Sequence, residues 1–159
     1  MKKLPYEREM AVRYARTWAF DRNPKYYDFE HIGGDCTNFV SQCLFAGCGV
    51  MNFTPNTGWY YRSLSDRAPA WSSVEYLFRF LTQNNRVGPI AEFVKESDLL
   101  PGDIIQLGNE SGRFYHSLIV TQISPKILVS AHSYDALDRP LQSYEYDIAR
   151  FLHVTHVLK

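Results

Sequence analysis

The chain has 159 residues, 45% of them hydrophobic, and its 17 Lys and Arg balance its 17 Asp and Glu at a formal net charge of zero. This length suits a single domain over residues 1–159 with a core of its own. The lack of a basic excess argues against a nucleic-acid partner and gives no general attraction to anionic lipid.

The chain carries no signature of export or membrane insertion. Two lysines near the N-terminus are followed by charged residues rather than an apolar run, which excludes a secretory signal. No stretch approaches the ~18 apolar residues of a membrane span. As written, the chain is expected to be cytoplasmic; as a domain of a longer exported protein it would be extracellular or in the cell wall.

Three helices are predicted in the first half of the chain. Residues 5–20 repeat bulky apolar side chains at every fourth position, which is typical of one helix face. Residues 36–46 follow Asp35, a favourable N-cap, and precede Gly47, a natural terminator. A capping box starts a third helix over residues 73–83.

The second half of the chain has β character. After an irregular stretch over residues 48–70 and the third helix, strands are predicted at 104–107, 114–123, 127–132 and 151–158. Helices followed by an antiparallel meander define an α+β fold. We therefore expect N-terminal helices packed on an antiparallel sheet.

Cys36 is the first candidate for chemistry. A lone free cysteine is usually a small core residue. Cys36, however, directly follows a capping position, where helix N–H groups and the helix dipole would lower the pKa of its thiol and stabilise an oxyanion. Cys43 lies on the apolar helix face and is expected in the core, whereas Cys48 is expected to be a loop thiol.

A nucleophilic cysteine needs a base, usually histidine. If a tight loop at 123–125 joins the two central strands, His116 falls directly opposite His132, on the same face of the hairpin. One ring could be the base and the other its orienter, as in a catalytic triad. Asp135 is the rival orienter, and His31 precedes Cys36 on a turn. The alternative is that both hairpin histidines are ordinary sheet residues.

No metal or other cofactor is expected. His31 and the three cysteines are spaced by five, seven and five residues, which matches no common zinc pattern. The aromatic residues at 59–61 and Trp71 could equally line a cleft or pack in the core.

The residues resemble a known family. Residues 33–43 (Gly-Gly-Asp-Cys-Thr-Asn-Phe-Val-Ser-Gln-Cys), preceded by Arg-Asn-Pro at 22–24, look like the bacterial putative amidase domain. That family is similar to the papain-like cell-wall peptidases of the NlpC and CHAP types. Pro-Gly-Asp at 101–103 matches the turn before the first strand of the papain-like half-barrel. Residues 115–120 match the strand with the catalytic histidine, and His132 the polar third residue.

The resemblance implies a mechanism and a site. Cys36 would be the nucleophile and His116 the base, with His132 as orienter, though Asp135 stays open as an alternative. The reaction would hydrolyse an amide bond in a peptide or peptidoglycan-like substrate, through a thioester and without a cofactor. The segment around Cys36 is not the papain signature, so cleavage of folded proteins does not follow. Three upstream side chains are candidates for the oxyanion hole: Asn23, Tyr26 and Tyr27.

Three other functions compete with this interpretation. A catalytically silent binding module could use the same fold. A papain-like acyltransferase would pass the acyl group to an amine or hydroxyl instead of water. A redox-sensing thiol protein would pair Cys36 with Cys43 or Cys48, but Cys43 lies two helical turns away.

Overall fold

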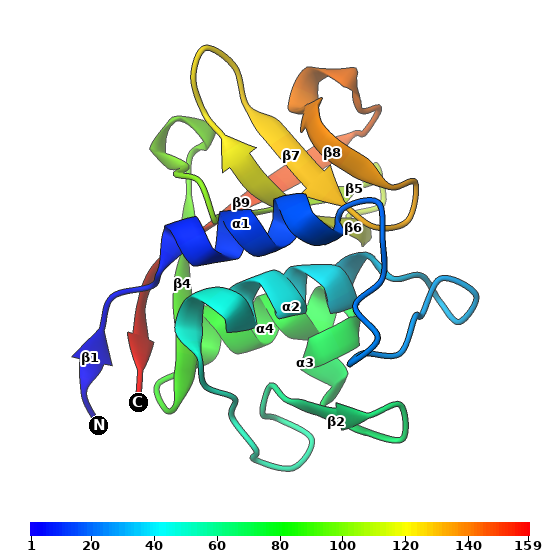
Figure 1. Cartoon of the computed structure of the whole chain (residues 1–159). Helices are drawn as coiled ribbons and strands as arrows, with labels where there is room; N and C mark the ends of the chain where they lie inside the picture. Colours follow the sequence, from blue (N-terminus) through cyan, green and yellow to red (C-terminus); the bar gives the residue numbers. More distant parts are fainter.

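The computed structural model describes all residues, 1–159 (Figure 1). Its helices are α1 (Arg8–Trp18), α2 (Cys36–Cys48), α3 (Pro69–Ser72) and α4 (Val74–Gln83), with 3-10 turns η1 (Glu96–Asp98) and η2 (Leu141–Ser143). The predicted third helix is confirmed as α4, which follows Ser73 at its cap position. None of these helices combines the length and the apolar composition of a membrane span.

The first helix begins later than its sequence pattern predicts. Residues 3–4 form the short strand β1 (Lys3–Leu4), which pairs with the C-terminal strand and keeps this segment extended. Tyr6 is anchored as well, because its hydroxyl donates to the Gly102 carbonyl at 2.9 Å. The chain is therefore free to turn into α1 only at Arg8.

The second helix runs past its predicted end. Gly47 lies inside α2, where Tyr6 packs so closely that a Cβ atom at Gly47 would come 2.4 Å from the tyrosine ring. Glycine is thus required at this position because the Tyr6 ring approaches the helix closely, and not because the helix ends there. The helix ends instead at Gly49, whose N–H donates to the Phe45 carbonyl in a left-handed cap.

The strands form one antiparallel sheet that is not closed into a barrel. The main strands are β4 (Gly88–Val94), β5 (Ile104–Gly108), β6 (Phe114–Gln122), β7 (Leu128–Ala131), β8 (Ala136–Pro140) and β9 (Ile148–Leu158). Their order is β1-β9-β5-β6-β7-β8, and β4 also pairs with β9. The predicted α+β class is confirmed, while β1, β4 and β8 were not predicted.

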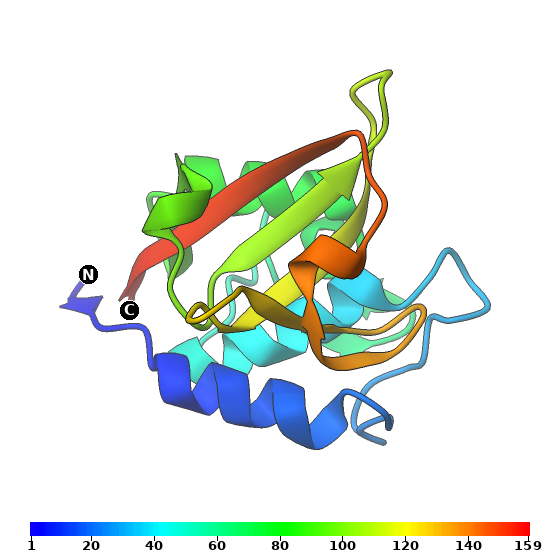
Figure 2. The same cartoon turned by 90° about the horizontal axis from the view of Figure 1, so that it is seen from above.

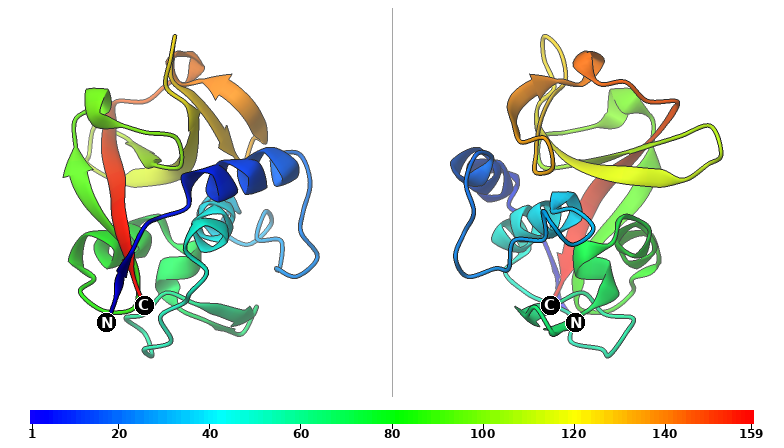
Figure 3. Two further views of the ribbon diagram at one scale, coloured as in Figure 1. Left: turned by 60° about the vertical axis from the view of Figure 1, so that its left-hand side comes forward. Right: turned by 90° about the vertical axis from the view of Figure 1, so that its right-hand side faces the viewer.

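The helices gather on one face of the curved sheet, as Figures 2 and 3 show. The main core lies between them and includes Phe39, Leu44 and Leu81 from helices and Ile104 and Ile119 from strands. A smaller core covers the other face of β5, β6 and β7, beneath the segments around η1 and η2. The start of α2 therefore meets the sheet beside β6.

The stretch predicted as irregular, residues 48–70, contains a small hairpin of β2 (Tyr61–Ser63) and β3 (Asp66–Arg67). Trp59 and Trp71 are fully buried in the main core, with ring centroids 4.9 Å apart. Each indole N–H is also satisfied, by Ser41 and Asn38 of α2 respectively. Of the two interpretations open for these tryptophans, core packing is the one observed.

Candidate active site

The β6–β7 hairpin determines which way the two site histidines point. The prediction placed His116 opposite His132, but the strands pair Ile119 with Ser130, one residue out of that register. Continuing the observed register brings His132 opposite Ser117. Because side chains alternate between the faces of a strand, His116 and His132 lie on opposite faces of the sheet. The predicted pairing of the two rings is therefore wrong.

His116 belongs to the face with the smaller core. It pairs across the sheet with Leu107 of that core, next to a bulge in the β5–β6 ladder. Its ring is 9% exposed and lies beside Tyr144, with centroids 6.2 Å apart. Burial and the nearby Arg139 charge lower the pKa of His116 to about 4. The ring is thus neutral at neutral pH and able to accept a proton.

Cys36 is the first residue of α2, as predicted, and its side chain is 7% exposed. The Thr37 hydroxyl lies 3.7 Å from its sulfur. The backbone N–H groups of Ser117 and Thr37 also donate toward the sulfur. The thiol therefore sits against β6 at the residue that follows His116.

The strand geometry explains why the Ser117 N–H is free for this contact. Val120 directs its N–H toward the β5 side of β6, where it donates to the Asp103 carbonyl at 2.8 Å. Alternate residues of an antiparallel strand direct their N–H groups oppositely, so Ser117 points toward the β7 side. The β6–β7 ladder ends at Ile119, and the Cys36 sulfur takes the place of the missing strand partner.

The electrostatics of the thiol differ from the prediction. Burial raises the pKa of Cys36 above its ordinary value, although the hydrogen bonds from Ser117 and Thr37 act in the opposite direction. The predicted lowering at a helix start is overridden because the sulfur is almost removed from water. No hydrogen bond joins Cys36 to His116, so the resting pair is a neutral thiol and a neutral imidazole.

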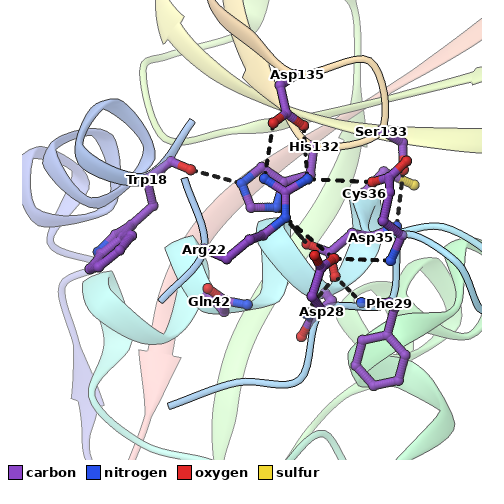
Figure 4. Close-up of polar contacts among 12 residues, drawn as sticks. Trp18, Arg22, Asp28, Phe29, Asp35, Cys36, Gln42, His132, Ser133 and Asp135 are labelled. Atoms are coloured by element: carbon purple, nitrogen blue, oxygen red, sulfur yellow. Dashed lines mark hydrogen bonds and ion pairs between the residues drawn. The ribbon is translucent and has the colours of Figure 1, made fainter. Parts of the chain in front are cut away.

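The two predicted orienters are engaged elsewhere, as Figure 4 shows. His132 binds Asp35 through Nδ1, at 2.5 Å, and donates from Nε2 to the Trp18 carbonyl at 2.7 Å. Asp135 accepts two hydrogen bonds from Arg22, each 3.0 Å long. Burial opposes the charge of Arg22, but the bonds and charge of Asp135 raise its pKa. Neither orienter reaches His116.

The upstream side chains considered for the oxyanion hole also have other partners. Asn23 donates to the Tyr14 hydroxyl at 3.1 Å. Tyr26 stacks on Trp71, and Tyr27 donates its backbone N–H to a neighbouring tyrosine hydroxyl. The N–H donors at the sulfur belong instead to Ser117 and Thr37.

Four residues near the site were not predicted from the sequence. Ser117 and Thr37 directly follow His116 and Cys36, and their hydroxyls bond to each other at 2.9 Å, so their positions in the sequence could have indicated them. Tyr144 and Arg139 come from the segment around η2 and reach His116 only through the tertiary fold. No group of three or more His, Cys, Asp or Glu is arranged to hold a metal ion.

Comparisons with known proteins agree with the sequence pattern. The chain is 38% identical over 150 residues to the uncharacterized protein YhbB of Bacillus subtilis (strain 168), covering 91% of this chain and 46% of that protein. The chain thus spans about half the length of this relative. No solved structure matches the present chain. The model of the family described as "Putative amidase domain" matches residues 5–155, so the chain belongs to this family, whose description indicates hydrolysis of an amide bond.

Proposed function

We propose that the chain is a cysteine amidase related to the papain-like peptidases of the NlpC and CHAP types. Cys36 is the nucleophile and His116 the base, and the substrate is an amide in a cell-wall-type peptide. The observation that carries the proposal is the position of the thiol. It sits at the start of α2 against the Ser117 N–H, one residue along β6 from a buried, neutral imidazole.

The proposed acylation step begins with attack of the Cys36 sulfur on the carbonyl carbon of the substrate, while the thiol proton passes to His116. Negative charge develops on the carbonyl oxygen, and backbone N–H groups at the start of α2 can stabilise it. The carbon–nitrogen bond then breaks, and the amine leaves with the proton from His116. A thioester on Cys36 remains.

Hydrolysis completes the cycle. Water attacks the thioester carbon and gives a proton to His116, and the carbon–sulfur bond breaks. The carboxylic acid departs and the proton returns to the sulfur. Because thiol and imidazole are both neutral at rest, the first proton moves as the sulfur–carbon bond forms. Their hydrogen bond, absent in the free protein, forms in the substrate complex, as catalytic contacts often do.

The proposal is tested with short peptide 4-nitroanilides and purified peptidoglycan, measuring released nitroaniline and released amines. Cys36→Ala and His116→Gln should each lose hydrolysis by a factor of about 10³ or more. Cys48→Ala and His156→Gln, which change the same residue types away from the site, should retain it. Hydrolysis by Cys36→Ala at the wild-type rate would refute a cysteine mechanism. Added amine acceptors distinguish hydrolysis from acyl transfer.

A further inference from the structure

The residue before the nucleophile has a fully buried carboxylate. Oδ1 of Asp35 accepts hydrogen bonds from the Phe29 N–H and the Asn38 side chain, both at 2.8 Å. Its Oδ2 faces Nδ1 of His132 at 2.5 Å. Asp35 makes no side-chain hydrogen bond that caps α2, contrary to its predicted role. Its carboxylate instead joins the segment before Cys36 to the end of β7.

The ring of His132 is fixed on three sides. One ring nitrogen contacts Oδ2 of Asp35 and the other contacts the Trp18 carbonyl, so both nitrogens are engaged. The ring also stacks on Phe39 of α2, with centroids 4.0 Å apart. His132 therefore contacts α1, α2 and the residue before the nucleophile at once, and it has no nitrogen left to orient His116.

The β7–β8 turn adds two further ties to the same segment. The Asp35 N–H donates to Oγ of Ser133 at 3.0 Å, and Asp135 binds Arg22, whose Nε lies 3.6 Å from Oδ2 of Asp35. Gly34, with a φ of +97°, passes so close to this turn that a Cβ atom there would lie 3.3 Å from Ser133. The backbone that enters Cys36 is thus held from both sides of Asp35.

We propose that Asp35 and His132 are positioning residues that hold the Cys36 thiol against the Ser117 N–H, and that His132 does not orient the base. This inference rests on the proposed function only for its effect on catalysis. Its effect on the cysteine itself is independent of any substrate. Misplacing a reacting atom by about 1 Å can cost about 10²-fold in rate, so the pair should control turnover without touching substrate.

The chain contains a matched pair for comparison. Asp103 is also fully buried, binds Nδ1 of His153 at 2.8 Å, and pairs with Arg8 at 2.7 Å. This second Asp–His–Arg cluster ties α1 to β9 and the turn before β5, away from the start of α2. The His153 side chain is 23% exposed, and the same substitutions there measure what loss of a histidine partner of a buried aspartate does to the fold alone.

The test uses two amide substitutions at each histidine. Asn can place its Nδ2 donor where Nδ1 of histidine lies, whereas Gln leaves the aspartate without that donor. His132→Gln should lower kcat for peptide 4-nitroanilides about 10²-fold with KM within about threefold, and His132→Asn should recover most of the loss. His153→Gln and His153→Asn should lower the unfolding midpoint in urea but keep kcat within about threefold.

A second readout is the ratio of iodoacetamide labelling rates at Cys36 and Cys48 in the same folded molecule, by peptide mass spectrometry. His132→Gln should change this ratio at least about tenfold, while both His153 variants leave it unchanged. If His132→Gln and His153→Gln lower stability alike and leave kcat and the ratio unchanged, the pair is purely structural and the inference fails. If neither the wild type nor any variant hydrolyses amides, but the ratio of labelling rates at Cys36 and Cys48 changes as stated, only the proposed function fails.

Discussion

The buried imidazole of His116 makes the stability of the protein depend on pH in a definite direction. Its pKa is lowered from 6.5 to about 4, first by burial and then by the charge of Arg139. Between these two values the unfolded chain binds a proton at this ring and the folded protein does not. The free energy of unfolding therefore falls as the pH drops from about 6.5 to about 4.

The size of this effect follows from the shift. One pKa unit corresponds to about 1.4 kcal/mol, so a shift of about 2.5 units corresponds to roughly 3 kcal/mol. The His116→Gln variant keeps a polar side chain of similar size but cannot titrate. The wild type should therefore lose roughly 3 kcal/mol more than His116→Gln between about pH 7 and pH 4.

Urea unfolding at intervals of about half a pH unit measures both proteins under the same conditions. Other carboxylates and histidines titrate in both, so their contributions cancel in the difference. If the two stability curves stay parallel down to about pH 4, the ring has an ordinary pKa. That result would refute a neutral, desolvated imidazole at His116.

Three further substitutions test the packing around the site. Tyr134 is 90% exposed, and Ser133 and Tyr134 both have positive φ, at 60° and 63°. Tyr134→Gly relieves the strain of a side chain at positive φ and should raise the free energy of unfolding, measured in urea, by about 0.5–1 kcal/mol. A lower free energy of unfolding in this variant would show that the backbone at Tyr134 is not strained. Ser41→Ala removes the acceptor of the Trp59 indole N–H and the donor to the Trp71 carbonyl. It should lower the free energy of unfolding by about 1–3 kcal/mol in the same assay. Gly47→Ala would press a methyl group on the Tyr6 ring and should lower the free energy of unfolding by about 1–3 kcal/mol in the same assay.

Local patterns in the sequence predict much of the fold. The capping-box sequence located α4, and the β-branched run located β6. By contrast, β4 begins with Gly88-Pro89, which reads as a break, and becomes a strand because the long β9 pairs with it. Long-range pairing of this kind leaves no mark in the local composition.

In the candidate site, too, local sequence predicted some features, while others depend on the tertiary fold. The position of Cys36 at a helix start was predictable from the residues before it. The face of the sheet to which His132 points was not predictable, because a bulge before Gln122 shifts the β6–β7 register and no sequence pattern marks this bulge. The raised pKa of the thiol was also missed, since burial depends on packing across the whole domain and outweighs the local helix dipole.

In the proposed reaction Cys36 carries the acyl group. Intact-mass and peptide mass spectrometry of the protein, quenched in acid during turnover of a short N-acyl peptide 4-nitroanilide, test it directly. The mass of the protein should increase by that of the acyl part, located on Cys36, and this increase should be absent from Cys36→Ala and unchanged in Cys43→Ala. Release of nitroaniline by Cys36→Ala at the wild-type rate, with no acyl group on any cysteine, would contradict it.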